Sequence, residues 1–262
     1  MIAFYQEIRN RLTLRASYPA AARLPGVVEV AGLSKRFGDH VAVDRLSFGA
    51  PAGQVTALLG PNGAGKTTTF RMLVGLARPT AGRALIKSQP YGQLDRPRDT
   101  VGAVLESSGF HPARTGRNHL RVIATAAGIR RDRVDEVLGL VGLGQAADRR
   151  VGGYSTGMRQ RLAVSGALLG DPEVIVLDEP TSGLDPEGVV WMRGLVREFA
   201  AEGRCVVLAS HGLAEVAQVA DRVVIIGHGR ALGEADVTSL DGGSLEELYL
   251  ALTARGEASK IR

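Results

Sequence analysis

Short apolar runs alternate along the chain with longer stretches of helical periodicity. Bare apolar runs predict buried strands at 54–59, 101–105, 174–177, 205–209 and 223–226. Helical spacing of apolar positions predicts helices at 66–76, 116–142, 158–169, 187–200 and 244–253. Strands that alternate with helices predict an α/β fold with a mostly parallel sheet.

Two regions depart from this alternation. Strand-like runs at 27–30 and 41–48 are separated by the turn signal Gly38-Asp39 and precede the first helix. The helix-rich stretch at about 112–153 interrupts the alternation, and we interpret it as an inserted helical subdomain.

The two ends of the chain lie outside the alternating pattern. Arginines and prolines mark residues 1–26, which we interpret as an N-terminal extension. A disordered leader is favoured there, and a basic amphipathic arm lying on lipid is the alternative. Residues 254–262 follow the last predicted helix as a C-terminal tail.

Composition narrows the partners and the compartment. The chain is 45% hydrophobic and carries a net charge of +5, but its basic residues form no dense block, so no nucleic-acid partner is expected. Its one cysteine, Cys205, lies in an apolar run, which predicts a buried strand thiol and fits a reducing compartment. No apolar run approaches the roughly 20 residues that span a bilayer. We therefore expect a cytoplasmic protein that reaches the membrane only through a partner.

The strongest motif follows the apolar run at 54–59. A glycine-rich loop, a lysine and two hydroxyl residues match the P-loop pattern. Its backbone N–H groups and the following helix N-terminus suit the phosphates of ATP, Lys66 suits the β- and γ-phosphates, and Thr67 suits Mg²⁺. The motif comprises Gly60, Pro61, Asn62, Gly63, Ala64, Gly65, Lys66, Thr67 and Thr68.

Two carboxylates end the apolar run at 174–177. Ligands of open α/β sheets bind beyond the carboxyl ends of the strands. Asp178 is therefore expected to hold Mg²⁺, directly or through water, and Glu179 to polarise the attacking water. The alternative is a solvated acidic pair at a strand end.

Three further segments complete a recognisable order. Tyr154-Ser155-Thr156-Gly157-Met158-Arg159-Gln160-Arg161-Leu162 lies between the two motifs, Pro180-Thr181-Ser182-Gly183-Leu184-Asp185-Pro186 follows Glu179, and Ser210-His211 ends a predicted strand. From residue 27 to residue 253 this order resembles the nucleotide-binding domain of ABC transporters. The resemblance implies a P-loop NTPase core, an antiparallel β subdomain and an inserted helical subdomain.

The resemblance also implies roles for single residues. Phe37 would stack on adenine, with a core aromatic as the alternative. Ser155 and Gly157, together with Met158 in the same turn, would close over the γ-phosphate held by the P-loop of another subunit. Asp185 would connect the two sites across the dimer. With Lys66 and Glu179, His211 would form the catalytic group by contacting the γ-phosphate and holding the attacking water.

Some positions depart from the family pattern. Glu106 replaces a glutamine that would approach Mg²⁺ and nucleotide, and our hypothesis is that it couples Mg²⁺ occupancy to the transport partner. Tyr154, Thr156 and Met158 replace leucine, glycine and glutamine, which resembles the exporter branch for drugs, antibiotics or lipids. The segments 107–112 and 115–120 resemble that branch too. Phe110 and His111 are candidates for a groove that receives a coupling helix, with an ordinary surface loop as the alternative.

The combined interpretation is an ATP-binding and ATP-hydrolysing subunit of an exporter. It would act as a dimer, most simply of two identical chains, on a separate permease at the inner face of the cell membrane. The alternatives are an importer subunit, or an ABC ATPase that acts on DNA or in translation without a permease. A nucleotide kinase or GTPase would not explain the 154–162 segment or Ser210-His211.

Overall fold

The computed structural model describes residues 26–105, 109–240 and 245–258 of the chain. Residues 1–25 of the predicted N-terminal extension, the tail beyond residue 258, Glu106 and Ser244, the first residue of the last predicted helix, lie outside the described residues. The proposed boundaries at 26, 112, 153 and 254 remain predictions.

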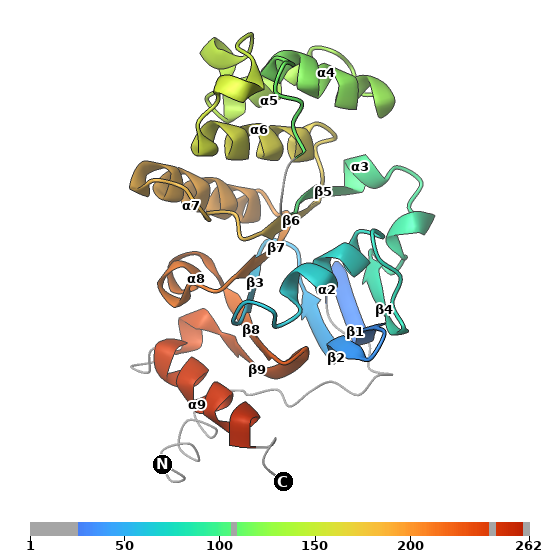
Figure 1. Cartoon of the computed structure of the whole chain (residues 1–262), viewed down its shortest axis with the longest axis vertical. Coiled ribbons are helices and arrows are strands. Elements are labelled where there is room, and N and C mark those ends of the chain that lie inside the picture. Colours follow the sequence, from blue (N-terminus) through green and yellow to red (C-terminus); the bar gives the residue numbers. More distant parts are fainter. Residues whose placement is uncertain (1–25, 106–108, 241–244, 259–262) are drawn as a thin grey trace.

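A six-stranded sheet forms the centre of the molecule, in the order β5-β6-β7-β3-β8-β9 (Figure 1). Its first five strands are parallel, as predicted, and β9 pairs antiparallel with β8 at one edge. The strands are β3 (Val55–Leu59), β5 (Val101–Val104), β6 (Val174–Asp178), β7 (Cys205–Ser210), β8 (Arg222–Gly227) and β9 (Arg230–Asp236). Cys205 is buried in β7, which confirms its prediction as a strand thiol.

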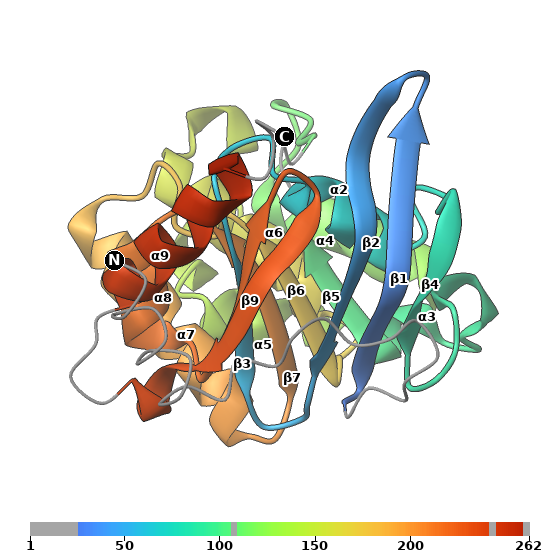
Figure 2. The same cartoon turned by 90° about the horizontal axis from the view of Figure 1, so that it is seen from below.

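A separate antiparallel sheet, in the order β2-β1-β4, stands beside the central one (Figure 2). It comprises β1 (Val28–Phe37), β2 (His40–Ala50) and β4 (Ala81–Ile86). Gly38, with a φ of 58°, forms the predicted turn between β1 and β2. This sheet is the predicted antiparallel β subdomain, and the apolar pattern missed its strand β4, as it missed β9 in the central sheet.

Helices cover the central sheet on both faces, so the alternating side chains of each strand enter two different cores. The core that contains Leu58 and Val207 packs against Phe70 of α2 (Lys66–Leu73) and against the antiparallel sheet. The other core contains Ala57 and Leu208, extends to the helices between residues 116 and 168, and packs against three further helices. These are α7 (Pro186–Ala201), α8 (Leu213–Val219) and α9 (Leu245–Ala258).

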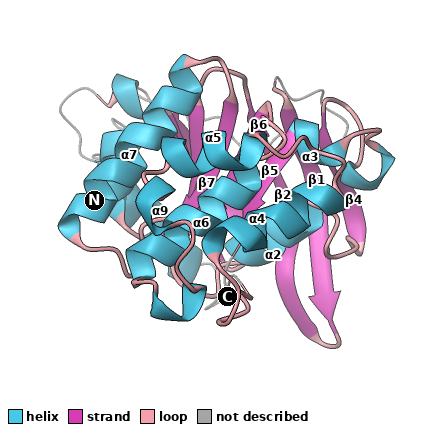
Figure 3. Ribbon diagram, turned by 90° about the horizontal axis from the view of Figure 1, so that it is seen from above, coloured by secondary structure: helices cyan, strands magenta, loops and turns pink. Residues whose placement is uncertain are grey.

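Three helices gather at the end of the molecule away from α9 (Figure 1), and Figure 3 looks onto that end from above. They are α4 (Gly116–Ala126), α5 (Arg133–Leu140) and α6 (Thr156–Leu168), and the short α3 (Pro97–Thr100) lies near β5. The prediction of one continuous helix at 116–142 was wrong, because two separate helices, α4 and α5, occupy this stretch. The chain leaves the helix at Gly128, which has a φ of 66°, and α5 then begins behind its own cap, Asp132. The predicted helix at 66–76 likewise ends early, at Leu73.

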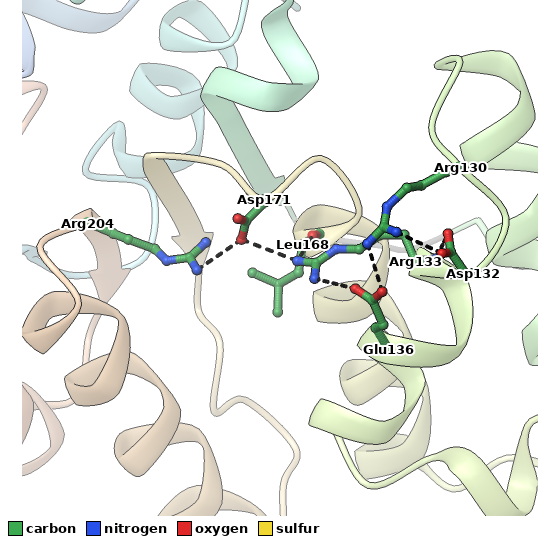
Figure 4. A network of polar contacts seen from close by, with 7 residues as sticks. All are labelled: Arg130, Asp132, Arg133, Glu136, Leu168, Asp171 and Arg204. Carbon is green, nitrogen blue, oxygen red and sulfur yellow. Dashed lines mark hydrogen bonds and ion pairs between the residues drawn. The ribbon is translucent and has the colours of Figure 1, made fainter.

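An ion-pair network ties this helical end to the central sheet (Figure 4). Asp171 lies in the connection between α6 and β6, and its Oδ1 is 3.2 Å from Arg133 of α5 and 3.0 Å from Arg204 just before β7. Arg133 also donates to the carbonyl of Leu168 at the end of α6. Elements from three parts of the chain therefore meet at one carboxylate.

Within the described part of the chain, none of the helices combines the length and the apolar character that a bilayer span requires.

Candidate functional site

The loop between β3 and α2 leaves no room for a side chain at two of its positions. A Cβ atom at Gly60 would lie 2.3 Å from the carbonyl oxygen of Ile226, and one at Gly65 would lie 2.5 Å from that of Ala42. Gly65 also has a φ of 99°, in the left-handed region. These constraints curl the loop around the start of α2.

The N-terminus of α2 is not covered by a capping side chain from the described residues, and the loop residues 61–63 before it are exposed to solvent. Gly65 occupies the N-cap position, and no described side chain caps the helix. The first backbone N–H groups of a helix have no intrahelical acceptor, and the helix dipole favours an anion there. This geometry fits a phosphate group.

Lys66, the first residue of α2, points back into the loop. Its side chain is only 6% exposed, and its Nζ donates to the carbonyls of Gly60 at 2.7 Å and Pro61 at 3.2 Å. The same Nζ lies 3.3 Å from Oε1 of Glu179. The loop cation and the carboxylate after β6 are therefore in direct ionic contact.

Glu179 links the end of β6 to the end of β7. Its Oε2 lies 2.8 Å from Nδ1 of His211, which follows β7. Glu179 adopts a φ of 48°, rare for a residue with a side chain, and its backbone N–H donates to the carbonyl of Ala209. Asp178, the last residue of β6, is 4% exposed. Both carboxylates thus lie at the carboxyl ends of the parallel strands, as the sequence predicted.

A cleft of about 580 Å³ unites these groups. Residues 62–68 line it together with Asp178, Glu179 and His211. Gln160 of α6 lines it too, as does His40 at the start of β2. Neither residue was singled out from the sequence, because only folding brings them close to the loop.

The oxygen chemistry of this cleft fits a divalent cation beside phosphate. Thr67 offers a hydroxyl, and Asp178 offers a carboxylate at the end of a buried strand. Mg²⁺ in nucleotide sites takes one or two protein oxygens and completes its shell with phosphates and water. Among the described residues there is no group of three or more His, Cys, Asp or Glu that would form a larger metal cage.

The 154–158 segment lies elsewhere. Ser155, exposed at the N-cap of α6, accepts a hydrogen bond at 3.2 Å from the backbone N–H of Met158. Ser155, Gly157 and Met158 are not among the residues that line the cleft. The start of α6 is therefore a second exposed helix N-terminus, capped by Ser155, and it lies outside the lining of the cleft at α2.

Two more predicted residues also lie outside the cleft lining. Phe37, at the end of β1, is 54% exposed, with Lys35 Nζ 4.9 Å from its ring centroid, so it is no core aromatic. Asp185 is the N-cap of α7 and accepts from the backbone N–H of Gly188 at 2.8 Å. Stacking of Phe37 on adenine and the contact of Asp185 across a dimer stay predictions.

A second hollow, of about 300 Å³, lies between β5 and helices α4 and α6. Phe110 lines it and makes an edge-to-face contact with His119, with ring centroids 4.9 Å apart. Burial, and to a lesser degree Arg114, lower the pKa of His119, which favours its neutral form. His111 is exposed, its Nδ1 accepts from the backbone N–H of Ala113, and it is not among the lining residues.

Comparisons with known proteins agree with this geometry. Residues 43–182 match the family described as ABC transporter. The chain is 37% identical over 235 residues to the bacitracin transport ATP-binding protein BcrA of Bacillus licheniformis, covering 88% of this chain and 77% of that protein. It is 37% identical over 220 residues to the Nod factor export ATP-binding protein I of Rhizobium sp. (strain N33), covering 81% and 72%.

Solved structures give the same result. An ATP-binding subunit of an ABC transporter superposes with a TM-score of 0.77 at 28% identity, covering 87% of this chain and 99% of that one. The match therefore includes the central sheet, the antiparallel sheet and the helical end.

Proposed function

The chain belongs to the ABC transporter family as an ATP-binding subunit, and we propose that two copies of it power an exporter through a separate membrane permease. Members of this family hydrolyse ATP to power transport.

The observation that carries the dimer is the separation of the two helix N-termini within one chain. The cleft holds the P-loop, Glu179 and His211, whereas the exposed Ser155 and the half-buried Gly157 lie outside its lining. A second copy arranged head to tail would bring its own Ser155 and Gly157 to the phosphates. Each copy would then supply what the other copy lacks, and ATP would favour the closed pair by binding it better than the separate chains.

The chain's own groups have distinct tasks in this arrangement. The loop N–H groups and Lys66 hold the β- and γ-phosphates, and Glu179 polarises the water that attacks the γ-phosphorus. His211, held 2.8 Å from Glu179, would contact the γ-phosphate and hold that water. Thr67 and Asp178 would hold Mg²⁺, and the bound ion would supply positive charge to the phosphates.

Export is proposed as the direction of transport. The relatives named above carry transport of bacitracin and export of Nod factor in their names. The 154–158 segment of this chain also departs from the usual family pattern in the way of the drug, antibiotic and lipid exporters. An importer subunit is the alternative, and a cytoplasmic location beneath the permease follows from either direction.

The hollow between β5, α4 and α6 is our candidate for the permease contact. It is open at the surface, and its lining combines apolar residues such as Phe110 and Ile123 with polar ones such as His119. A short amphipathic helix of the permease fits such a lining. Phe110 would contact that helix directly, while His111 would lie at its edge.

Reconstitution tests transport. The chain would be purified together with its permease, placed in sealed vesicles and supplied with ATP on the side that exposes this subunit. Export predicts ATP-dependent movement of cargo away from that side, and this movement stops in the Glu179→Gln variant. Movement toward the subunit would establish an importer, and hydrolysis that no permease stimulates would contradict a transport role.

A further inference from the structure

Arg161 of α6 and Trp191 of α7 hold two helices together through one contact. The guanidinium carbon of Arg161 lies 4.0 Å from the centroid of the Trp191 ring, which is the geometry of a cation–π interaction. Arg161 Nη1 also donates at 2.9 Å to the carbonyl of Val141, the C-cap residue of α5. One side chain thus joins α5, α6 and α7, of which α6 and α7 lie side by side in Figure 1.

The position of this contact relates it to the residues proposed to face the second subunit. Arg161 lies six residues after Ser155, and Trp191 lies six residues after Asp185. Six helical residues correspond to about 9 Å along each axis. The contact therefore lies at a similar distance along its helix from each of the two N-cap residues, Ser155 and Asp185.

The segments in front of this contact also touch each other. A Cβ atom at Gly183 would lie 3.4 Å from Thr156 Cγ2, and one at Gly157 would lie 3.8 Å from Leu184 Cδ2. Met158, Leu184 and Trp191 all pack partly buried against the same hydrophobic core. The start of α6 and the loop before α7 thus form a continuous surface.

We propose that Arg161 and Trp191 are positioning residues that fix α6 against α7, so that Ser155, Gly157 and Asp185 meet the second subunit as one rigid edge. This proposal rests on the proposed nucleotide-sandwich dimer. Hydrogen bonds to phosphate weaken steeply with misalignment, so loosening the two helices weakens closure of the dimer. ATP binding to the P-loop of a single chain is unaffected, because neither residue lines the cleft.

The test uses the Glu179→Gln chain, in which hydrolysis is blocked, with Arg161→Met as the second change. Mg-ATP-driven dimerisation would be followed by sedimentation, and ATP affinity would be measured on dilute monomer. Loss of the cation–π contact should raise the dissociation constant of the dimer roughly threefold for each of the two protomers. The dissociation constant should therefore rise roughly tenfold in total. ATP affinity of the monomer should stay within about twofold.

Trp191 reports the contact directly, because it is the one tryptophan of the chain. Arg161→Met should increase quenching of its fluorescence by acrylamide, since the guanidinium no longer covers the ring. Arg161→Lys, which keeps a cation over the ring, should restore most of the dimerisation. Arg197→Met is the matched control, because Arg197 lies on α7 but pairs with Asp221. It should leave dimerisation unchanged.

Each outcome has one meaning. Increased quenching with weaker dimerisation and intact ATP binding supports the proposal. Increased quenching with unchanged dimerisation overturns it, and so does unchanged quenching, which would mean that the contact does not form in solution. Equal loss in the Arg197→Met control also overturns it.

If Arg161→Met fails to fold, Trp191→Phe, which keeps a smaller ring, replaces it in the sedimentation assay and should weaken dimerisation less. Failure of the parent Glu179→Gln chain to dimerise would instead remove the proposed dimer itself, and this inference with it.

Discussion

Lys66 Nζ lies 3.3 Å from Oε1 of Glu179, while Oε2 of the same carboxylate lies 2.8 Å from His211. The γ-phosphate of ATP would compete with Glu179 for the Lys66 ammonium. Binding of ATP would therefore free one carboxylate oxygen for the attacking water, while His211 keeps hold of the other oxygen. Nucleotide binding and the positioning of the base are linked through one side chain, which the left-handed backbone at residue 179 aims into the cleft.

Glu179→Gln should separate binding from hydrolysis. The amide keeps the shape and can still bond to His211, but it cannot act as a base. We expect phosphate release to fall by about 10²–10⁴-fold while ATP still binds. Glu198→Gln, on the exposed surface of α7, is the control and should leave the rate unchanged. A Glu179→Gln chain that hydrolyses ATP at the parent rate would remove Glu179 from the mechanism.

Ser155 has a structural role that can be separated from its proposed contact with phosphate. Its side chain caps α6, so Ser155→Ala should lower stability by about 1 kcal/mol. Ser155→Asp keeps a capping oxygen and should retain the parent melting temperature, yet its charge should repel the γ-phosphate and suppress hydrolysis. Thermal denaturation and phosphate release would be measured on both variants. Full hydrolysis by Ser155→Asp would show that this helix N-terminus does not meet ATP.

Asp171 should contribute to stability mainly through its backbone. Its side chain is 64% exposed, so loss of its ion pairs in Asp171→Asn should cost only about 0.2–1 kcal/mol, and less at high salt. Its φ of 54° is tolerated by Asp and Asn but not by branched residues, so Asp171→Val should cost at least about 1–2 kcal/mol more. Urea denaturation of the two variants measures the difference. Equal stability of both variants would contradict the left-handed conformation.

Cys205 should resist alkylation in the folded chain. Burial raises its pKa from 9.0 to about 12, so at about pH 8 the reactive thiolate is scarce and the sulfur is covered. A raised pKa of an acid stabilises the fold below pH 9.0, and this contribution is lost as the pH rises from 9.0 toward 12. Iodoacetamide should therefore label the chain only after unfolding in guanidinium chloride. Cys205→Ala supplies the unlabelled control, and rapid labelling of the folded chain would contradict the burial.

Apolar patterning predicted the strands of the central sheet that are buried on both faces. The strands that contain Ala57, Val176 and Leu208 show continuous apolar runs because helices cover both sides of the sheet. The missed strands β4 and β9 lie at sheet edges and carry exposed polar residues such as Arg83 and Arg230, so they lack that pattern. The division of 116–142 into two helices depends on one backbone angle at Gly128, which periodicity does not report.

The candidate site was predictable where its residues are contiguous in sequence or end a recognised strand. The loop at 60–68, Asp178 and Glu179 have these properties, and the structure brings most of them to one cleft with His211. Gln160 was missed because its place in the cleft depends on how α6 crosses the end of β5. Ser155 was recognised only by resemblance, since its partner would belong to another copy of the chain.

Complementation between two inactive chains tests the shared site most directly. Lys66→Ala removes the phosphate cation, whereas Gly157→Asp places a negative charge at the start of α6, where a Cβ atom makes only ordinary contacts. Each variant alone should be inactive in the presence of Mg-ATP. In a mixed dimer, however, the intact P-loop of the Gly157→Asp chain faces the intact Ser155 and Gly157 of the Lys66→Ala chain. The account predicts that mixing the two restores phosphate release well above the sum of the separate chains. A mixture no more active than that sum would contradict a site built from two copies.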